Sequence, residues 1–388
     1  MRQAVIAGYA RTPFSFAGKG PLKSVRPDDL AAIAIAGLVD RSGVPVHLIE
    51  DVIVGCAYPE GPQGNNIGRI SALLAGLPIS VGGATINRFC GSSMYGIHIA
   101  AGQIAIGSGE AFICAGVESM SLVPRGGLSP SLNPRLVRHP SNEDEFLFDG
   151  YVTMGETAEN VARRYKVSRL QQERFAYQSQ MKAASAQSAG RLAAEIVPVR
   201  IDADTSVDAD SCIRTQTTME RLAELKPAFH EGGSVTAGTS SPLTDGASAV
   251  LVTSAEFALE HGLDVLAKIK STAVVGVWPE FMGIGPIPAT RKALSRAGID
   301  ISEIDVVELN EAFASQAIAC VNELGIDMDR VNIDGGGISL GHPLGATGAR
   351  ITAKAAQILR REGKRYALAT QCIGGGQGIA TILETAEV

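Results

Sequence analysis

The sequence predicts an α/β protein made of two similar halves, and three observations predict it. Short runs rich in β-branched residues alternate with longer Ala-rich runs, a pattern typical of β-α-β units with mostly parallel strands. The two ends of the chain resemble each other at a near-constant spacing, since Asp51-Val52 is matched by Asp305-Val306, 254 residues later. A length of 388 residues leaves room for two domains.

Each β-branched run predicts a strand, and each Ala-rich run predicts a helix. In the first half the expected strands are residues 4–7, 51–55, 84–87, 111–115 and 247–253, and the expected helices are residues 27–41 and 92–106. In the second half the expected strands are residues 265–275, 306–309, 331–333, 366–370 and 378–384, and the expected helices are residues 287–297 and 346–361. The match between the halves extends to Gly109 and Gly363, each of which stands just before a strand.

A stretch of different character separates the two copies. Residues 119–149 hold four prolines with little periodicity and are predicted to form a loop. Helices are expected after this loop at residues 155–165 and 168–189, and the second opens with the capping-box pattern Ser168-x-x-Gln171.

The domain division follows from the repeat and from this stretch. We predict an N-terminal domain of residues 1–260, a C-terminal domain of residues 261–388, and a loop domain inserted in the first at about residues 119–246. Long loops inserted into a rigid scaffold commonly shape a binding site.

Composition and charge exclude several classes of protein. Hydrophobic residues make up 45% of the chain, which excludes disorder, and the net charge of −6 is too acidic for nucleic acid as the main partner. The longest apolar stretch, residues 31–39, is far shorter than a membrane span of about 20 residues. The N-terminus reads as a strand rather than a signal or transit peptide. Six cysteines without a C-x-x-C pair predict no zinc site, no disulfide framework and a reduced, cytoplasmic location.

Glycine is over-represented and concentrated in two segments. The chain holds 44 glycines in 388 residues, above the usual share of about 7%, with six in residues 335–348 and four in residues 374–378. Bare backbone lets a ligand approach closely and permits positive φ. Neither segment matches a phosphate-binding loop or a dinucleotide fingerprint, and tight turns with close helix packing would also explain them.

Two reactive side chains lie in these glycine segments. His342 follows the expected strand at residues 331–333, and Cys372 follows the strand at residues 366–370. The carboxyl ends of parallel strands share one edge of a sheet, so both residues are predicted to lie on the same rim. Cys90 joins them through the repeat, because its equivalent position lies beside His342, and its place before an expected helix favours a thiolate. The remaining cysteines are expected to be buried apolar residues: Cys56, Cys114, Cys212 and Cys320.

At these residues the sequence resembles the thiolase family over essentially its whole length. Five stretches carry the resemblance: Asn87-Arg88-Phe89-Cys90-Gly91-Ser92-Ser93, Thr236-Ala237-Gly238-Thr239-Ser240-Ser241, Asn310-Glu311-Ala312-Phe313-Ala314, Gly341-His342-Pro343-Leu344-Gly345 and Cys372-Ile373-Gly374-Gly375-Gly376-Gln377-Gly378. Each stretch alone is a weak signal, whereas all five in this order and spacing are specific. The Cys-Gly-Ser-Ser form resembles the fatty-acid-degrading 3-ketoacyl-CoA thiolases in particular. The resemblance implies a five-layered αβαβα fold of two similar halves plus an inserted loop domain.

The resemblance also implies a role for each site residue. Cys90 would be the nucleophile that holds the acyl group, activated by His342, and Cys372 would be the acid and base that protonates the leaving carbanion and deprotonates CoA. Two oxyanion holes are implied, one made by His342 with a water held by Asn310, the other by the backbone N–H groups of Cys90 and Gly374. The residues implied to line the CoA tunnel are Ser241, Met282 and Phe313. We expect no metal and no cofactor, since coenzyme A is a substrate.

The activity implied is thiolytic cleavage of 3-ketoacyl-CoA by CoA in fatty-acid β-oxidation, reversible as a Claisen condensation. Thr153 stands where short-chain biosynthetic thiolases carry His, which favours a substrate longer than acetoacetyl-CoA. Asp334 replaces the Asn usual before the glycine run, and the sequence offers no account of it. The resemblance further implies a homodimer or homotetramer and a partner subunit of β-oxidation.

Four other functions stay open at this point. One is acetoacetyl-CoA thiolase, the biosynthetic acetyl-CoA acetyltransferase. A non-catalytic relative that binds acyl-CoA or lipid would be expected to have lost a catalytic Cys or His, and none is lost here. A Cys-His hydrolase would explain Cys90 and His342 but leave Cys372 unused, and a nucleotide-dependent oxidoreductase would explain the glycines alone.

Overall fold

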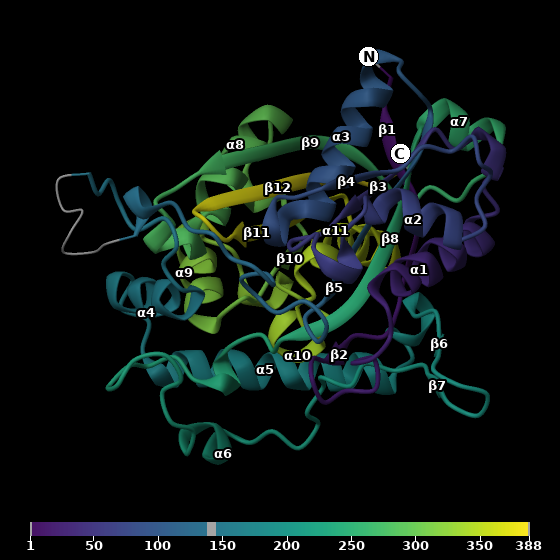
Figure 1. Cartoon of the computed structure of the whole chain (residues 1–388). Helices are drawn as coiled ribbons and strands as arrows, with labels where there is room; N and C mark the ends of the chain where they lie inside the picture. The colour runs from purple at the N-terminus through teal and green to yellow at the C-terminus, as the bar shows by residue number, and fades with distance from the viewer. Residues whose placement is uncertain (1, 138–144, 387–388) are drawn as a thin grey trace.

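A computed structural model describes residues 2–137 and 145–386 (Figure 1). Residues 138–144 of the expected loop, with Pro140, lie outside the described residues. The helices are α1 (Pro27–Ser42), α2 (Ile67–Leu74), α3 (Ser92–Ile106), α4 (Met154–Arg164), α5 (Arg169–Ser188), α6 (Met219–Ala223), α7 (Ala255–Glu260), α8 (Pro286–Ala297), α9 (Ala314–Leu324), α10 (Gly337–Leu340) and α11 (Leu344–Arg361). The strands are β1 (Ala4–Arg11), β2 (Ser15–Phe16), β3 (Asp51–Gly55), β4 (Ala84–Ile86), β5 (Ala111–Ser119), β6 (Val199–Arg200), β7 (Ser206–Val207), β8 (Thr244–Ser254), β9 (Ala267–Gly276), β10 (Val306–Leu309), β11 (Tyr366–Ile373) and β12 (Gln377–Glu384).

The main sheet repeats one strand order twice. Within the described residues it runs β10-β11-β12-β9-β1-β8-β5-β3-β4, with β2 paired to β8. Read outward from its centre, β1-β8-β5-β3 in the first half corresponds to β9-β12-β11-β10 in the second. The halves meet where Val5 and Ile6 of β1 pair with Lys268 and Ala267 of β9. The expected repeat is therefore present as two copies of one α/β unit.

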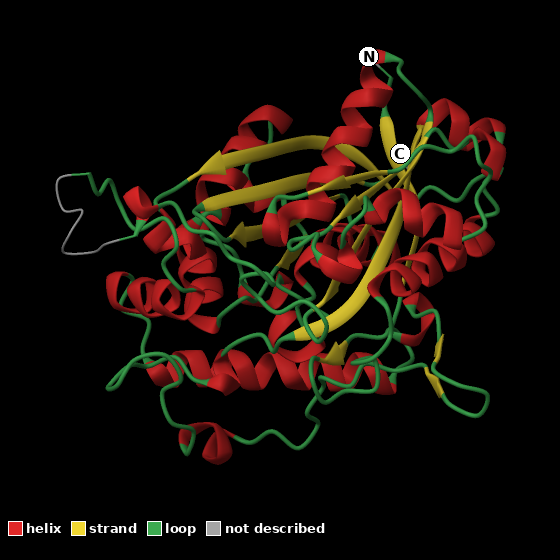
Figure 2. Cartoon of the chain, viewed as in Figure 1, coloured by secondary structure: helices red, strands yellow, loops and turns green. Residues whose placement is uncertain are grey.

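Helices and sheet halves alternate in five layers, as the resemblance implied. One buried apolar cluster joins α1 and α2 to the first half of the sheet. A second surrounds α3 and α11, which lie between the two halves (Figure 1). A third joins the second half of the sheet to α8 and α9. Figure 2 shows the strands crossing the middle of the molecule with helices on both sides. Among the described residues, no helix is both long and apolar enough to span a membrane.

The expectation of mostly parallel strands is wrong. Parallel pairing occurs at β3–β4, β3–β5 and β10–β11, whereas β8 and β12 run antiparallel to both of their main neighbours. The turn at Gly374, Gly375 and Gly376 explains one case, because a connection this short can only return the chain beside itself in the opposite direction. An alternation of strand and helix patterns does not reveal such hairpins.

The strand expected at residues 331–333 is also wrong. Val331 makes a single parallel bridge to Val307, and the chain then turns away. Asn332 has φ +48°, and its side chain accepts from the Leu309 amide and donates to the Leu309 carbonyl at 2.9 and 2.8 Å. A polar side chain thus takes the backbone hydrogen bonds that a further strand would have used. The other expected strands and helices are found with ends shifted by a few residues.

The insertion lies on one side of the sheet and holds α4, α5 and α6 with the small β6–β7 hairpin. The predicted cap of α5 is present, since Ser168 and Gln171 form a capping box, and α4 has a capping box of its own at Thr153 and Glu156 that was not predicted. In Figure 1, α5 runs across the lower part of the molecule with α6 below it, and α4 lies beside α9. The insertion therefore packs beside the second half of the sheet, although in the sequence it is inserted into the first half.

Candidate active site

Cys90 lies in a tight strand-to-helix corner. It belongs to a single 3₁₀ turn, Phe89–Gly91, between β4 and α3. Phe89 has φ +43°, an unusual conformation for a non-glycine residue. Asn87 Oδ1 accepts from the Phe89 amide at 2.8 Å, and Ser92 Oγ donates to the Phe89 carbonyl at 2.6 Å, so both ends of the turn are held. Cys90 as a whole is only partly buried in this corner.

The Cys90 thiol does not have the lowered pKa that its position before α3 predicts. Burial raises the pKa of Cys90 to about 11, and the amide N–H groups of Gly374 and of Cys90 itself offset only part of that rise. The free protein therefore holds a neutral thiol at pH 7, and ionisation requires a base. The same two amides are the donors expected to form an oxyanion hole, so the structure brings Cys90 and Gly374 together.

Cys372 lies near the end of β11, two residues before Gly374. Its side chain is buried in an apolar cluster with Met282 and Phe313. Burial raises the pKa of the Cys372 thiol, and the charge of an ionised Cys90 would raise it further, which places the two thiols within electrostatic reach. The structure thus brings both expected reactive cysteines to one place.

The Gly374 turn has one position where a Cβ would fit and one where it would not. A Cβ at Gly374 would meet nothing nearer than Met154 Sδ at 3.6 Å, an ordinary contact distance. At Gly376 the φ is +87° and a Cβ would lie 2.3 Å from the Val277 carbonyl oxygen. Gly376 is therefore required by the fold, whereas the bare backbone of Gly374 leaves room beside the two thiols.

His342 lies in the loop between α10 and α11 rather than directly after a strand. Its Nδ1 lies 2.6 Å from Thr347 Oγ1, which itself donates to the Pro343 carbonyl at 3.0 Å. Thr347 must therefore accept from Nδ1–H, so the proton of the neutral ring sits on Nδ1 and the lone pair on Nε2. Asn310 Nδ2 donates to that Nε2 at 3.3 Å. Burial, together with the charge of Arg350, lowers the pKa of His342 to about 3, so the ring is neutral at pH 7.

Asn310 lies at the carboxyl edge of the parallel strands, the edge where the site residues were predicted to gather. It follows β10, which runs parallel to β11, and its amide donates to the Thr370 carbonyl at 3.0 Å. Asn310 and Cys372 therefore share one end of the sheet. The Asn310 Oδ1 atom is buried without a hydrogen-bond partner among the described residues, an arrangement that fits an acceptor for an ordered water.

Two of the three residues implied to line a CoA tunnel lie beside Cys372. Met282 and Phe313 share its apolar cluster, and Phe229 meets the Phe313 ring edge-on with centroids 5.9 Å apart. Ser241 joins them indirectly, since its amide and hydroxyl both donate to the Ala312 carbonyl at 3.0 and 3.2 Å.

Sequence reasoning missed Glu118, which fastens the loops around the site. Its buried carboxylate accepts from the amides of Ala57 and Gly345, each at 2.9 Å, and from Gln63 Nε2 at 2.8 Å. It therefore ties the segment after β3 to the first turn of α11, beside His342. The available signal was an acidic residue near the end of an otherwise apolar strand. Thr347 was missed as well, and its only signal was its place five residues after His342.

The structure accounts for Asp334. Its carboxylate is fully buried and contacts three cations, Arg191 Nε at 2.8 Å, Lys354 Nζ at 2.9 Å and Arg361 Nη1 at 2.7 Å. Burial would raise the pKa of Asp334, but these cations, Lys354 first, lower it to about 2. Asn in this position would leave Arg191 without an ion-pair partner among the described residues, whereas Lys354 would keep Glu195 and Arg361 would keep Glu362. Because Arg191 follows α5 whereas Lys354 and Arg361 belong to α11, Asp334 ties the insertion to the helix behind His342.

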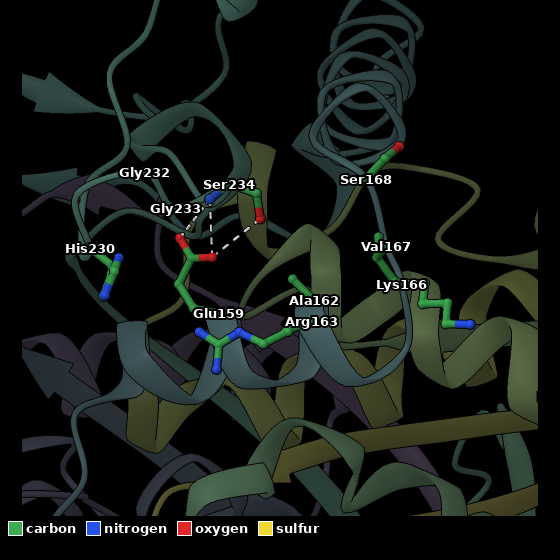
Figure 3. A pocket seen from close by; sticks show the side chains of 10 residues that line it. All are labelled: Glu159, Ala162, Arg163, Lys166, Val167, Ser168, His230, Gly232, Gly233 and Ser234. Atoms are coloured by element: carbon green, nitrogen blue, oxygen red, sulfur yellow. Dashed lines mark hydrogen bonds between the residues drawn. The ribbon is translucent and has the colours of Figure 1, made fainter.

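A cleft of ≈ 550 Å³ lies at the end of α4, and none of the predicted site residues lines it (Figure 3). Its one buried carboxylate, Glu159, points toward the opposite loop and accepts from the amides of Ser234 and Val235 at 2.9 and 2.8 Å. Val235 packs in the apolar cluster of Cys372. Glu159 therefore ties α4 to the loop that places Val235 in the apolar cluster of Cys372.

Comparisons with known proteins agree along the whole chain. The family model described as "Thiolase, N-terminal domain" matches residues 4–256, and "Thiolase, C-terminal domain" matches residues 263–385. The 3-oxoadipyl-CoA/3-oxo-5,6-dehydrosuberyl-CoA thiolase of Escherichia coli is 46% identical, covering 99% of this chain and all of the relative. The 3-ketoacyl-CoA thiolase of Bacillus subtilis is 43% identical over the same shares. A crystal structure of the Bacillus anthracis acetyl-CoA acetyltransferase superposes with a TM-score of 0.89 at 38% identity, covering 99% of both chains.

Proposed function

The chain belongs to the thiolase family of acyltransferases, and we propose that it cleaves 3-ketoacyl-CoA with CoA to give acetyl-CoA and a shortened acyl-CoA. One observation carries the proposal. A partly buried cysteine, Cys90, and a second thiol, Cys372, lie at one end of the sheet where His342 is held as a neutral base whose Nε2 lone pair faces only the Asn310 amide among the described residues.

The first half-reaction transfers the acyl group to the enzyme. His342 Nε2 accepts the Cys90 proton, and the thiolate attacks the C3 ketone carbon of the substrate. The C2–C3 bond then breaks, the electron pair stays on C2, and Cys372 donates its proton to that carbon. Acetyl-CoA leaves, and Cys90 carries the remaining acyl group as a thioester.

The second half-reaction uses the same groups in reverse. The Cys372 thiolate accepts the proton of the incoming CoA thiol, and the CoA sulfur attacks the acyl thioester. The bond to Cys90 breaks, and the departing Cys90 thiolate recovers a proton from His342. The raised pKa of Cys372 suits a group that must return a proton to carbon.

Negative charge on the reacting oxygens has two sets of donors. The Cys90 and Gly374 amides form one set. The protonated Nε2 of His342 forms the other, together with a water bound to Asn310 Oδ1, which is otherwise without a partner among the described atoms. Each donor of this kind is worth about 10²-fold or more in rate.

The acyl group is the open part of the proposal. The relatives' names include simple 3-ketoacyl groups, as in fatty-acid β-oxidation, and 3-oxoadipyl, which ends in a carboxylate. Acetoacetyl-CoA is the weaker candidate, because Thr153 is used as the N-cap of α4, bonded to Glu156, and supplies no basic side chain. A cytoplasmic location, a homodimer or homotetramer and a β-oxidation partner subunit remain predictions.

The test is a thiolysis assay with 3-ketohexanoyl-CoA and free CoA, with mass spectrometry of the Cys90 peptide. We expect Cys90→Ala to abolish both turnover and the acylated peptide. Cys372→Ala should lower turnover by about 10²- to 10⁴-fold, because it removes the group that moves the proton to and from carbon and CoA. Cys114→Ala, a buried cysteine within β5, is the matched control and should keep activity. Full activity without Cys90, or cleavage that does not need CoA, would show that the proposal is wrong.

A further inference from the structure

A short loop after β5 lies close to Cys90. Residues 124–128 form a turn in which the Gly127 amide donates to the Pro124 carbonyl at 2.9 Å. Glu60 Oε2 accepts from the Leu128 amide at 2.8 Å, and the Gly126 amide lies near enough to the Tyr58 hydroxyl to oppose the rise in its pKa that burial causes. The loop is therefore anchored at its Leu128 end to the segment after β3.

Tyr58 connects this loop to the nucleophile. Its ring lies 5.9 Å from the Phe89 ring, and both Tyr58 and Cys90 pack against an apolar cluster formed by Ala57, Met120 and Leu344. An aromatic ring and an apolar wall thus border the thiol on the side where the loop lies. This surface suits the methylene groups of an acyl chain attached to Cys90.

Arg125 stands at the tip of this loop with its charge unused. The side chain is exposed and forms no ion pair with any residue that the structure describes. Burial raises the pKa of Cys90 and of Tyr58, and the Arg125 charge opposes that rise at both groups, so the guanidinium lies within electrostatic reach of both. The neighbouring Arg88 is already engaged, with Nη1 donating to Gln377 Oε1 at 2.7 Å.

We propose that Arg125 binds a carboxylate at the far end of the acyl group, so that 3-ketodicarboxylyl-CoA is a preferred class of substrate. This inference rests on the proposed function and specifies its acyl group. The apolar cluster contacts the methylene groups, and the guanidinium offers a planar pair of donors that matches a carboxylate. Arg125 is a specificity-determining residue, because it acts on the end of the chain opposite to the reacting carbon.

Two substrates of equal length test the proposal. 3-Ketoadipyl-CoA ends in a carboxylate where 3-ketohexanoyl-CoA ends in a methyl group. We expect Arg125→Gln to lower kcat/KM for 3-ketoadipyl-CoA about tenfold or more and to change the value for 3-ketohexanoyl-CoA less than twofold. Arg125→Lys should recover part of the loss, and Arg163→Gln, an exposed arginine of α4, should change neither value.

Binding of the shortened products tests the same contact without turnover. Succinyl-CoA should bind the wild-type protein more tightly than butyryl-CoA, and Arg125→Gln should remove the difference. An equal loss for both substrates, a raised KM for CoA, or equal binding of the two products would overturn the role of Arg125. If the wild-type protein cleaves neither substrate, the proposed function fails, and the product-binding difference still decides whether Arg125 recognises a carboxylate.

Discussion

The hydrogen bond between Thr347 and His342 predicts a loss of catalysis when Thr347 is replaced by Val. Val has nearly the same shape but no hydroxyl, so the change leaves the packing of α11 in place and removes the acceptor for Nδ1–H. Both side chains are buried, and the contact is short at 2.6 Å. A buried donor left without a partner costs about 1–3 kcal/mol.

That cost shifts the tautomer equilibrium of the His342 ring. With Nδ1–H unpaired, the ring gains by moving the proton to Nε2, the atom that must accept the Cys90 proton. A bias of about 1–3 kcal/mol corresponds to roughly 5- to 150-fold. The Asn310 Nδ2 group donates to Nε2 and opposes the move, so we expect kcat to fall about tenfold, with KM changed little.

Steady-state thiolysis measures kcat and KM, and long-range ¹H–¹⁵N NMR of the imidazole reports which nitrogen carries the proton. Thr352→Val is the matched control, because Thr352 is also buried on α11 but donates to the Gly348 carbonyl at 2.7 Å, away from His342. If Thr347→Val keeps kcat within twofold of Thr352→Val, or if the wild-type ring is protonated on Nε2, the reasoning on the base is refuted.

Three further predictions concern the Gly374 turn, Asp334 and the Cys90 thiol. Gly374→Ala should fold normally, since its Cβ meets only ordinary contacts, but it should lose activity because the Cβ fills the space beside the thiols. Gly376→Ala should lower the melting temperature, because its Cβ would collide with the Val277 carbonyl oxygen. Equal melting temperatures of the two variants would contradict this reasoning. Asp334→Asn should lower the free energy of unfolding by about 1–3 kcal/mol, because it removes the carboxylate that pairs with Arg191 and one of the two that pair with buried Lys354. The cations lower the pKa of Asp334 to about 2, below its ordinary value of 3.8, so the stability that this carboxylate contributes is complete above about pH 4 and is lost as the pH falls toward 2. Denaturant unfolding at pH 5 and pH 8 should therefore show the same penalty, and a large difference between the two would argue against a charged Asp334. Alkylation of Cys90 by iodoacetamide should rise about tenfold per unit between pH 7 and 9, since its pKa is about 11, and a plateau in that range would point to a thiolate.

The sequence predicted the strand-and-helix framework well because each buried face leaves a periodic pattern. The repeat at Asp51 and Asp305, and the Ser168 cap, are local signals of this kind. The sequence led to the wrong strand direction because the pairing of a strand depends on partners far away in the chain. It also led to a wrong strand at Asn332, because a side chain that takes the hydrogen bonds of a neighbouring strand leaves no periodic pattern in the sequence.

The candidate site was predicted from its motifs, and its electrostatics were not. The position of Cys90 before α3 favoured a thiolate, but burial outweighs the amide donors, and burial depends on the whole fold. The roles of Glu118 and Thr347 in holding the site could not be predicted from the sequence for a related reason. Each acts through one hydrogen-bonded contact whose partner is defined only when two loops meet.

One connection differs greatly in length between the two copies. The chain passes from β11 to β12 through residues 374–376, whereas the equivalent passage from β5 to β8 takes residues 120–243. The short passage lies among the reacting groups and cannot vary without moving them. The long passage can exchange side chains, or whole turns, while Cys90, His342 and Cys372 stay where the scaffold puts them. Substitutions that change the preferred acyl group are therefore expected in the long passage. Its first residues, which include Arg125, are the part where we expect such substitutions to act most directly.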